Sequence, residues 1–173
     1  MIDAETEALA AETLQAAREA GLRIATAESC TGGLVMGALT AVAGSSDVAE
    51  RGFVTYSNWA KMEALGVPAD LIRDHGAVSE EVAQAMAEGA MKHARAGLVV
   101  SLTGVAGPGG TALKPEGMVC FGLARRGAAT VTQDMRFGAL GRGEVRRASV
   151  HHALRLLRDA ARAAKAEGTA PDS

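Results

Sequence analysis

Strand-like segments alternate with helix-like segments through most of this chain, and that alternation restricts the fold more than any other feature of the sequence. Ala4 to Ala20 is rich in Ala, Glu and Leu, lacks Pro, and is followed by Gly21, so it predicts a helix. The continuous apolar run from Leu98 to Thr103 predicts a buried central strand. Helices that separate strands in this way are typical of an α/β sandwich with helices on both faces of the sheet.

Turn signals and helix caps give the remaining boundaries. The expected strands are residues 22–28, 51–57, 117–124 and 129–137, and the expected helices are residues 31–42, 58–65, 79–94 and 143–164. Asn58 and Ser79 are the expected N-caps of two of these helices. Only a turn around Arg126 and Gly127 separates the last two strands, which leaves no room for a crossover helix. We therefore expect at least one antiparallel pair in a mixed sheet.

Length and composition restrict the class of protein. A chain of 173 residues with 48% hydrophobic residues is expected to form one domain, residues 1–164, followed by a flexible tail at residues 165–173. The net charge of −2 argues against a nucleic-acid surface, where a basic patch is expected. The acidic N-terminus is unlike a signal peptide, and no apolar run approaches the ~20 residues of a membrane span. We expect a cytoplasmic protein without a membrane partner.

The first candidate site is the segment Thr26 to Gly33, which ends a strand and opens a helix. Ser29 would project from the strand end, where sites form in open α/β sheets, and could act as a nucleophile. Gly32 and Gly33 would let a ligand approach the backbone, and free N–H groups near Thr31 would stabilise an anion or an oxyanion. The alternative is that Ser29 or Thr31 only caps the helix.

The second candidate is Lys61, near the start of the helix expected at residues 58–65. With Asn58 as the N-cap, Lys61 is the third helical residue, where the helix dipole disfavours an ammonium group. A lysine that is also desolvated can become a general base, and Tyr56 at the strand end could share a proton with it. The alternative is a solvated surface lysine.

The third candidate is a glycine-rich loop that follows the buried strand, from Thr103 to Gly110. Such loops can wrap a phosphate with backbone N–H groups. The Lys-Ser/Thr pair of a Walker A loop and the G-x-G-x-x-G dinucleotide fingerprint are both missing from this segment. The alternative is a structural turn.

The fourth candidate is a pair of arginines at the start of the last helix. Arg142 and Arg146 are four residues apart and can face the same way, and arginines at a helix N-terminus oppose the dipole, so they could serve an anion. The alternative is a solvated basic turn. His151 and His152 are adjacent and diverge on a helix, unlike an i,i+4 metal pair. We expect no metal and no cofactor.

Taken together and in this order, these segments resemble the CinA C-terminal domain family over roughly residues 5–160. The resemblance rests on residues 27–33, 43–46, 51–58, 76–79, 103–110 and 114–117. It implies a three-layer α/β/α sandwich with a mixed, mostly parallel five-stranded sheet. It also implies hydrolysis of the carboxamide of nicotinamide mononucleotide to nicotinate mononucleotide and ammonia without a metal, and it makes a dimer plausible.

The same resemblance implies the roles of individual residues. Ser29 and Lys61 match the catalytic positions, with Tyr56 close by. The implied substrate contacts are Thr31, Gly32, Gly33, Ser45, Ser46, Thr103, Gly104, Gly107, Gly109, Arg142 and Arg146.

The chain also departs from the family pattern at a few positions. Glu116 stands where an apolar residue is common, Trp59 stands where an acidic residue is common, and the loop over residues 109–114 is short. Two alternatives to this hydrolase stay open: a non-catalytic module that binds a ribotide or a protein partner, and an amidase of the same mechanism that acts on another amide.

Overall fold

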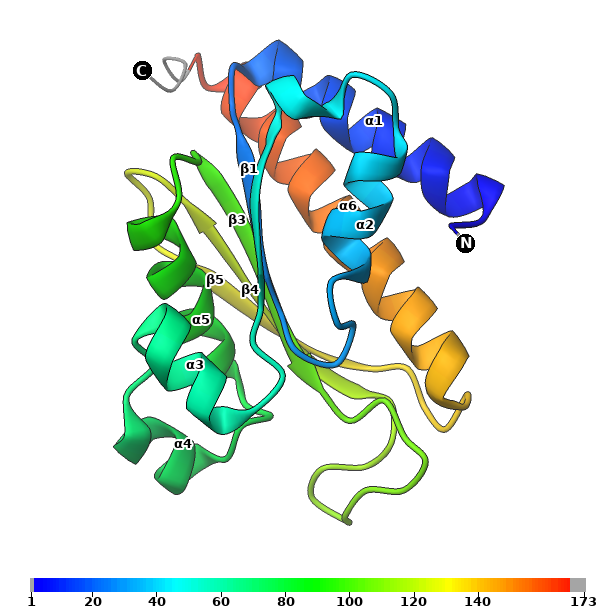
Figure 1. Ribbon diagram of the computed structural model, residues 1–173, viewed down its shortest axis with the longest axis vertical. Helices are drawn as coiled ribbons and strands as arrows, with labels where there is room; N and C mark the ends of the chain where they lie inside the picture. Colours follow the sequence, from blue (N-terminus) through cyan, green and yellow to red (C-terminus); the bar gives the residue numbers. More distant parts are fainter. Residues whose placement is uncertain (1, 169–173) are drawn as a thin grey trace.

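The structure is a computed structural model that describes residues 2–168 of the 173. Helices and strands alternate over the first two thirds of the chain, and a strand pair and one long helix complete it (Figure 1). In chain order the elements are α1 (Ala4–Ala20), β1 (Ile24–Glu28), α2 (Leu34–Ala41), the 3-10 turn η1 (Ser45–Asp47), β2 (Ala49–Val54), α3 (Asn58–Leu65), α4 (Ala69–His75), α5 (Glu80–His93), β3 (Leu98–Gly104), β4 (Met118–Arg125), β5 (Val131–Arg136) and α6 (Arg142–Ala166).

The five strands form one mixed sheet with the order β2-β1-β3-β4-β5. β1 pairs in parallel with β2 and β3, whereas β4 pairs antiparallel with both β3 and β5. Four strands therefore run in one direction, and only β4 runs against them. This sheet confirms the expected fold class and the antiparallel pairing of the last two strands.

Helices cover both faces of the sheet (Figure 1). On one face α1, α2 and α6 bury a core that includes Leu14, Leu102 and Leu154. On the other face α3, α4 and α5 pack over Ala25 and Val99 and over neighbouring small side chains. Consecutive strand residues face opposite layers, so each side chain at a strand end is assigned to one layer by its position.

The contact between α3 and α5 depends on a glycine. Gly89 in α5 lies so close to the backbone carbonyl of Leu65, at the end of α3, that a Cβ at position 89 would overlap with it. The missing side chain lets the two helices pack with their backbones nearly in contact. Helix α5 therefore sets the position of α3 above the sheet.

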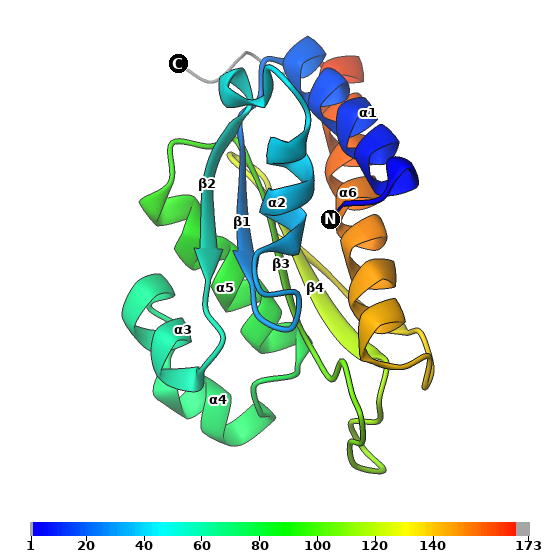
Figure 2. The same ribbon diagram turned by 45° about the vertical axis from the view of Figure 1, so that its right-hand side comes forward.

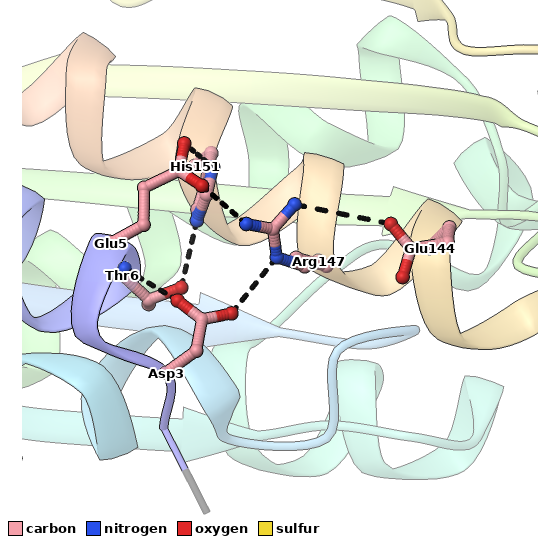
Figure 3. Close-up of polar contacts among 6 residues, drawn as sticks. All are labelled: Asp3, Glu5, Thr6, Glu144, Arg147 and His151. Atoms are coloured by element: carbon pink, nitrogen blue, oxygen red, sulfur yellow. Dashed lines mark hydrogen bonds and ion pairs between the residues drawn. The ribbon is translucent and has the colours of Figure 1, made fainter.

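The N-terminal turn of α1 is joined to α6 by a polar cluster (Figure 3). Asp3 caps α1 by accepting a 2.7 Å hydrogen bond from the Thr6 N–H, and Arg147 donates to Asp3 at 2.9 Å and pairs with Glu5. The Thr6 hydroxyl lies 2.7 Å from Nε2 of His151, whose pKa is lowered by burial. These contacts hold the first helix against the last one.

Two features differ from those expected. Helix α4 was not expected, because it lies in a short segment between two glycines. Helix α6 continues to Ala166, so the first two residues of the expected tail are helical, whereas its residues 169–173 lie outside the described residues. Within residues 2–168, no helix combines the length and the apolar character needed to cross a membrane.

Candidate functional site

The first site residue, Ser29, follows the last residue of β1. Ala25 and Ala27 in β1 face the layer of α5, and the alternation of side chains gives Ser29 the same side. The Ser29 N–H donates a 3.0 Å hydrogen bond to Leu102 O, which continues the pairing of β1 with β3. Ser29 is buried to 8% exposure. Its hydroxyl therefore stands at the carboxyl end of the parallel strands, on the face that α3 covers.

Lys61 meets Ser29 from α3. Its Nζ lies 3.0 Å from Ser29 Oγ and donates to the carbonyl of Thr55 at 2.9 Å. The side chain is only 1% exposed, and this burial lowers the pKa of Lys61 below its ordinary value of 10.5. The solvated-lysine alternative is therefore wrong, and the structure brings the two candidate catalytic residues together.

The N-cap of α3 was predicted one residue too late. Ser57, not Asn58, caps the helix, and its hydroxyl accepts a 3.0 Å hydrogen bond from the Ala60 N–H. Lys61 is therefore the fourth helical residue, and its own N–H is already bonded to Ser57 O. The dipole argument is weaker at this position, and desolvation is the main reason for the low pKa.

The loop from Ser29 to Gly33, here called the β1 loop, does not leave all its amides free as expected. Gly32 N–H donates to Ser29 O at 3.0 Å, and Gly33 N–H donates to the side chain of Glu28 at 3.1 Å. Among the described residues, the N–H groups of Cys30 and Thr31 donate no hydrogen bond. The turn needs the left-handed conformation of Gly33, with φ 96°.

Sequence reasoning missed Glu28, the most strongly bonded residue near this loop. Its carboxylate is fully buried and accepts five hydrogen bonds, from the hydroxyls of Thr26 and Thr31 and the amides of Gly33, Val35 and Met36. A glutamate that ends an otherwise apolar buried strand was the available signal, because such a charge needs several donors.

Arg146 is bonded to the chain itself. Its Nε and one terminal nitrogen donate to the carbonyls of Cys30 and Thr31, each at 3.1 Å. The guanidinium group therefore holds the β1 loop from the side of α6. Carbonyls exposed by a tight turn are acceptors for any nearby arginine, and the expected anion contact of Arg146 stays a prediction.

Tyr56 contacts Arg142 rather than Lys61. The hydroxyl of Tyr56 accepts a 2.7 Å hydrogen bond from Arg142, which also donates to Gly107 O at 2.9 Å. Tyr56 is 60% exposed. The structure thus joins three segments that the sequence separates: the end of β2, the loop after β3 and the start of α6. All three lie at the same end of the sheet (Figure 2).

The loop after β3, residues 105–117 and here called the β3 loop, is fastened by a carboxylate. Glu116 accepts hydrogen bonds from the N–H groups of Gly109 at 3.2 Å and Gly141 at 3.0 Å. The Gly109 amide that was expected to face a phosphate is therefore already bonded. The sequence offered a signal here, since Glu116 was noted as unusual for its position.

Two further predicted contacts are occupied by the fold itself. The hydroxyl of Thr103 is 1% exposed and donates to Ala77 O at 2.8 Å, which ties β3 to the segment before α5. Gly104 packs against Val119, since a Cβ there would lie 2.6 Å from its side chain. The hydroxyl of Thr103 is therefore already bonded within the fold, and its expected contact with a substrate stays a prediction.

Ser45 and Ser46 lie at the other end of the sheet, so within one chain the structure does not bring them to Ser29 and Lys61. They form η1, which precedes β2, and the neighbouring Val48 carbonyl accepts from Ile24 N–H at the start of β1. Ser29 follows the end of the same five-residue strand. At about 3.3 Å per residue, the two ends of β1 are separated by about 16 Å.

One buried hydroxyl near the pair is unused. Thr55 is 1% exposed, and among the described residues its Oγ1 has no hydrogen-bond partner. Its carbonyl, by contrast, accepts from Lys61. Buried polar atoms are rarely left unbonded, so this hydroxyl is available to a water or a ligand. Over residues 2–168, no group of three or more His, Cys, Asp or Glu side chains is arranged to hold a metal ion.

The sequence matches one family model, described as the CinA C-terminal domain, over residues 6–161. A CinA-like protein from Mycobacterium sp. (strain JLS) is 53% identical over 146 residues, which are 84% of this chain and 34% of that protein. A CinA-like protein from Syntrophobacter fumaroxidans is 50% identical over 141 residues, 81% of this chain and 33% of that protein. The chain thus spans about a third of the length of these curated relatives.

Solved structures agree over nearly the full length of both chains. The competence/damage inducible protein CihA from Agrobacterium tumefaciens superposes with a TM-score of 0.87 at 46% identity, covering 91% of this chain and 96% of that chain. The competence damage-inducible protein A from Klebsiella pneumoniae gives a TM-score of 0.85 at 37% identity, covering 89% and 95%. The fold is therefore shared with these proteins.

Proposed function

Because the chain belongs to the CinA C-terminal domain family, we propose that it is an amidohydrolase that converts nicotinamide mononucleotide to nicotinate mononucleotide and ammonia. The observation that carries the proposal is the 3.0 Å contact between Ser29 Oγ and a buried Lys61 Nζ. A hydroxyl beside an amine whose pKa is lowered by burial is the combination that activates a serine nucleophile.

In the first half of the reaction, Ser29 attacks the carboxamide carbon while neutral Lys61 takes the hydroxyl proton. The Thr55 carbonyl holds one N–H of Lys61, so the nitrogen lone pair is left for the Ser29 hydroxyl. The unbonded amides of Cys30 and Thr31 supply the donors for the oxyanion. Such a donor contributes about 3–4 kcal/mol to the transition state.

The tetrahedral intermediate then collapses, and the C–N bond breaks. The ammonium group of Lys61 returns its proton to the leaving nitrogen, so ammonia departs and an ester with Ser29 remains. Water attacks this ester with Lys61 again as base, which releases the carboxylic acid and restores the serine. The unpartnered hydroxyl of Thr55, the residue whose carbonyl bonds Lys61, is a group that can orient that water.

The mononucleotide would lie toward the β3 loop. Arg142 stands between this loop and Tyr56, and its planar guanidinium suits a phosphate. Because both its hydrogen bonds are internal, substrate binding exchanges at least one of them. The exposed ring of Trp59, on the first turn of α3, can stack on a pyridinium cation. Location in the cytoplasm and assembly as a dimer belong to this proposal as well.

The test is ammonia release from nicotinamide mononucleotide, in the presence of a metal chelator, by the wild-type chain and two serine variants. Ser29→Ala should lower turnover by at least about 1,000-fold while the melting temperature stays close to that of the wild type. Ser46→Ala is the matched control. Ser46 lies in η1, at the other end of the sheet from Ser29, so this variant should retain full activity. Undiminished turnover by Ser29→Ala would remove Ser29 from the mechanism.

A substrate panel separates the proposal from its alternatives. Nicotinamide, the riboside, the mononucleotide and the dinucleotide differ in the phosphate and in what it carries, so a preference for the mononucleotide would implicate the Arg142 side of the site. Binding of the mononucleotide without ammonia release would identify a non-catalytic ribotide-binding module. Release of ammonia from a different amide would keep the mechanism and replace the substrate.

A further inference from the structure

Glu28 is enclosed by donors from both ends of the β1 loop. One carboxylate oxygen accepts from the Thr31 hydroxyl at 2.7 Å and from the amides of Gly33 and Val35 at 3.1 and 3.0 Å. The other accepts from Met36 N–H at 2.9 Å and from the Thr26 hydroxyl at 3.1 Å. Because the side chain is fully buried, these donors replace its water shell.

This arrangement changes the role of the N-terminus of α2. The amides that a helix N-terminus offers to an anion are here bonded to a carboxylate of the chain itself. A substrate anion is therefore excluded from them. The amides left free are instead those of Cys30 and Thr31, the two residues that directly follow the nucleophile.

Arg146 holds the same two residues by their other backbone groups. It donates to Cys30 O and Thr31 O, so the carbonyls of both residues are fixed while their amides stay unbonded. Glu28 and Arg146 act on the loop from different elements, the first as an acceptor at the end of β1 and the second as a donor from α6. The loop conformation is thus set by two opposite charges that do not touch the reacting atoms.

We propose that Glu28 is a positioning residue that holds the β1 loop so that Ser29 Oγ meets Lys61 Nζ and the amides of Cys30 and Thr31 converge on the oxyanion. The inference rests on the proposed function only for the substrate used in the assay. Strand alternation supports it, because Glu28 and Ser29 are consecutive and point to opposite faces. Anchoring the first side chain therefore orients the second.

The experiment compares Glu28→Gln with Glu50→Gln. Glu50 is a half-buried glutamate at the start of edge strand β2, where it accepts from Arg95 N–H at 3.2 Å, so it controls for loss of a bonded carboxylate elsewhere. Three quantities are measured for each folded variant: kcat and KM for nicotinamide mononucleotide, the rate at which a fluorophosphonate labels Ser29, and the pH profile of kcat.

The side chain of a glutamine cannot accept a hydrogen bond from every donor around residue 28, so the loop should shift by up to about 1 Å. We expect kcat of Glu28→Gln to fall about 100-fold and Ser29 labelling to slow by a similar factor. KM should stay within about twofold, and the midpoint of the pH profile should not move, because burial rather than the charge of Glu28 lowers the pKa of Lys61. Glu50→Gln should match the wild type in all three measurements.

The inference is overturned if folded Glu28→Gln keeps wild-type kcat and labelling, or if only its KM changes. Failure of the fluorophosphonate to label wild-type Ser29 would overturn it as well, since no activated serine would then exist to be positioned. If the wild type is labelled but releases no ammonia from the mononucleotide, the substrate assignment fails, and the labelling rates of the two variants still decide the role of Glu28.

A milder variant covers the case in which Glu28→Gln does not fold. Thr26→Val has nearly the same shape as the native residue and removes one donor from the carboxylate, on the strand rather than in the β1 loop. We expect severalfold slower labelling of Ser29 at unchanged KM. Labelling at the wild-type rate in Thr26→Val would overturn the inference.

Discussion

The β1 loop and the β3 loop both follow parallel strands at the same end of the sheet, but they are built in opposite ways. The β1 loop is short, and Glu28 and Arg146 hold it on both edges. The β3 loop is long and exposed, with Leu113 83% accessible, and the polar bonds that hold it include those of Glu116 to Gly109 and Gly141. The first suits groups that must not move, and the second suits contacts that form when a ligand arrives.

Helix α6 reaches both loops with arginines one turn apart. Arg146 donates to carbonyls of the β1 loop, whereas Arg142 donates to Gly107 O in the β3 loop and to the Tyr56 hydroxyl. Two arginines of the same helix therefore serve different loops, Arg146 the fixed one and Arg142 the adaptable one. Substitutions on the two sides should accordingly separate turnover from affinity.

The largest effect should come from Lys61, whose amine contacts Ser29 of the β1 loop and no residue of the β3 loop among the described hydrogen bonds. Lys61→Met removes the base but keeps an apolar chain of similar length, so kcat should fall about 10²–10⁴-fold with little change in KM. Steady-state ammonia release at pH 8 measures this. If instead KM rises while kcat is kept, Lys61 contacts the substrate, and the β1 loop serves affinity rather than turnover.

Arg146→Ala should come next, because it frees one edge of the β1 loop. Loss of the bonds to Cys30 O and Thr31 O should lower kcat about 100-fold at nearly constant KM, since a small displacement of reacting groups is costly. Arg155→Ala, an exposed arginine of the same helix, is the control and should behave as the wild type. A pure KM effect would show that Arg146 binds substrate.

Arg142→Ala should have a smaller effect of the other kind. Its guanidinium donates hydrogen bonds to the β3 loop and to Tyr56, and not to the β1 loop. KM for the mononucleotide should therefore rise about tenfold while kcat changes little. KM for the riboside, which lacks the phosphate, should be unaffected. Equal effects on both substrates would place the phosphate elsewhere.

The smallest effect concerns stability. Burial lowers the pKa of Lys61 in the folded chain below 10.5, so the unfolded chain binds more protons, and folding becomes less favourable as pH falls below 10.5. Lys61→Met does not titrate and should melt at a higher temperature than the wild type at pH 7, by about 2–4 °C for each kcal/mol gained. The difference should shrink as pH rises toward 10.5, and a difference independent of pH would contradict the burial effect.

The sequence was sufficient for the fold because the signals were strong and local. Gly21 ends the first helix at the expected residue, and the apolar run at Leu98 forms the central strand. The meeting of Ser29 and Lys61 was also predictable in outline, since the carboxyl ends of neighbouring parallel strands share one edge of the sheet.

Side-chain partners were less predictable than strand ends. Whether Arg146 points to an empty space or to the carbonyl of Cys30 depends on the rotation of α6 about its axis, which a sequence does not specify to within one hydrogen bond. Tyr56 was expected to share a proton with Lys61 because it stands at the strand end, yet its hydroxyl reaches Arg142, 86 residues away. The position of Ser46 was not predictable for a different reason, because a motif shared by a family does not state which end of the sheet it occupies.

The close approach of Gly89 to Leu65 has a consequence for how this chemistry could be retuned. Lys61 is carried by a helix whose height above the sheet is fixed by a neighbouring helix backbone, so the spacing between base and nucleophile is set behind the site and out of reach of any substrate. A single methyl group added at residue 89 would push α3, and with it Lys61, away from its present position. A substitution behind the site can therefore change activity while all the reacting groups and binding surfaces keep their own residues.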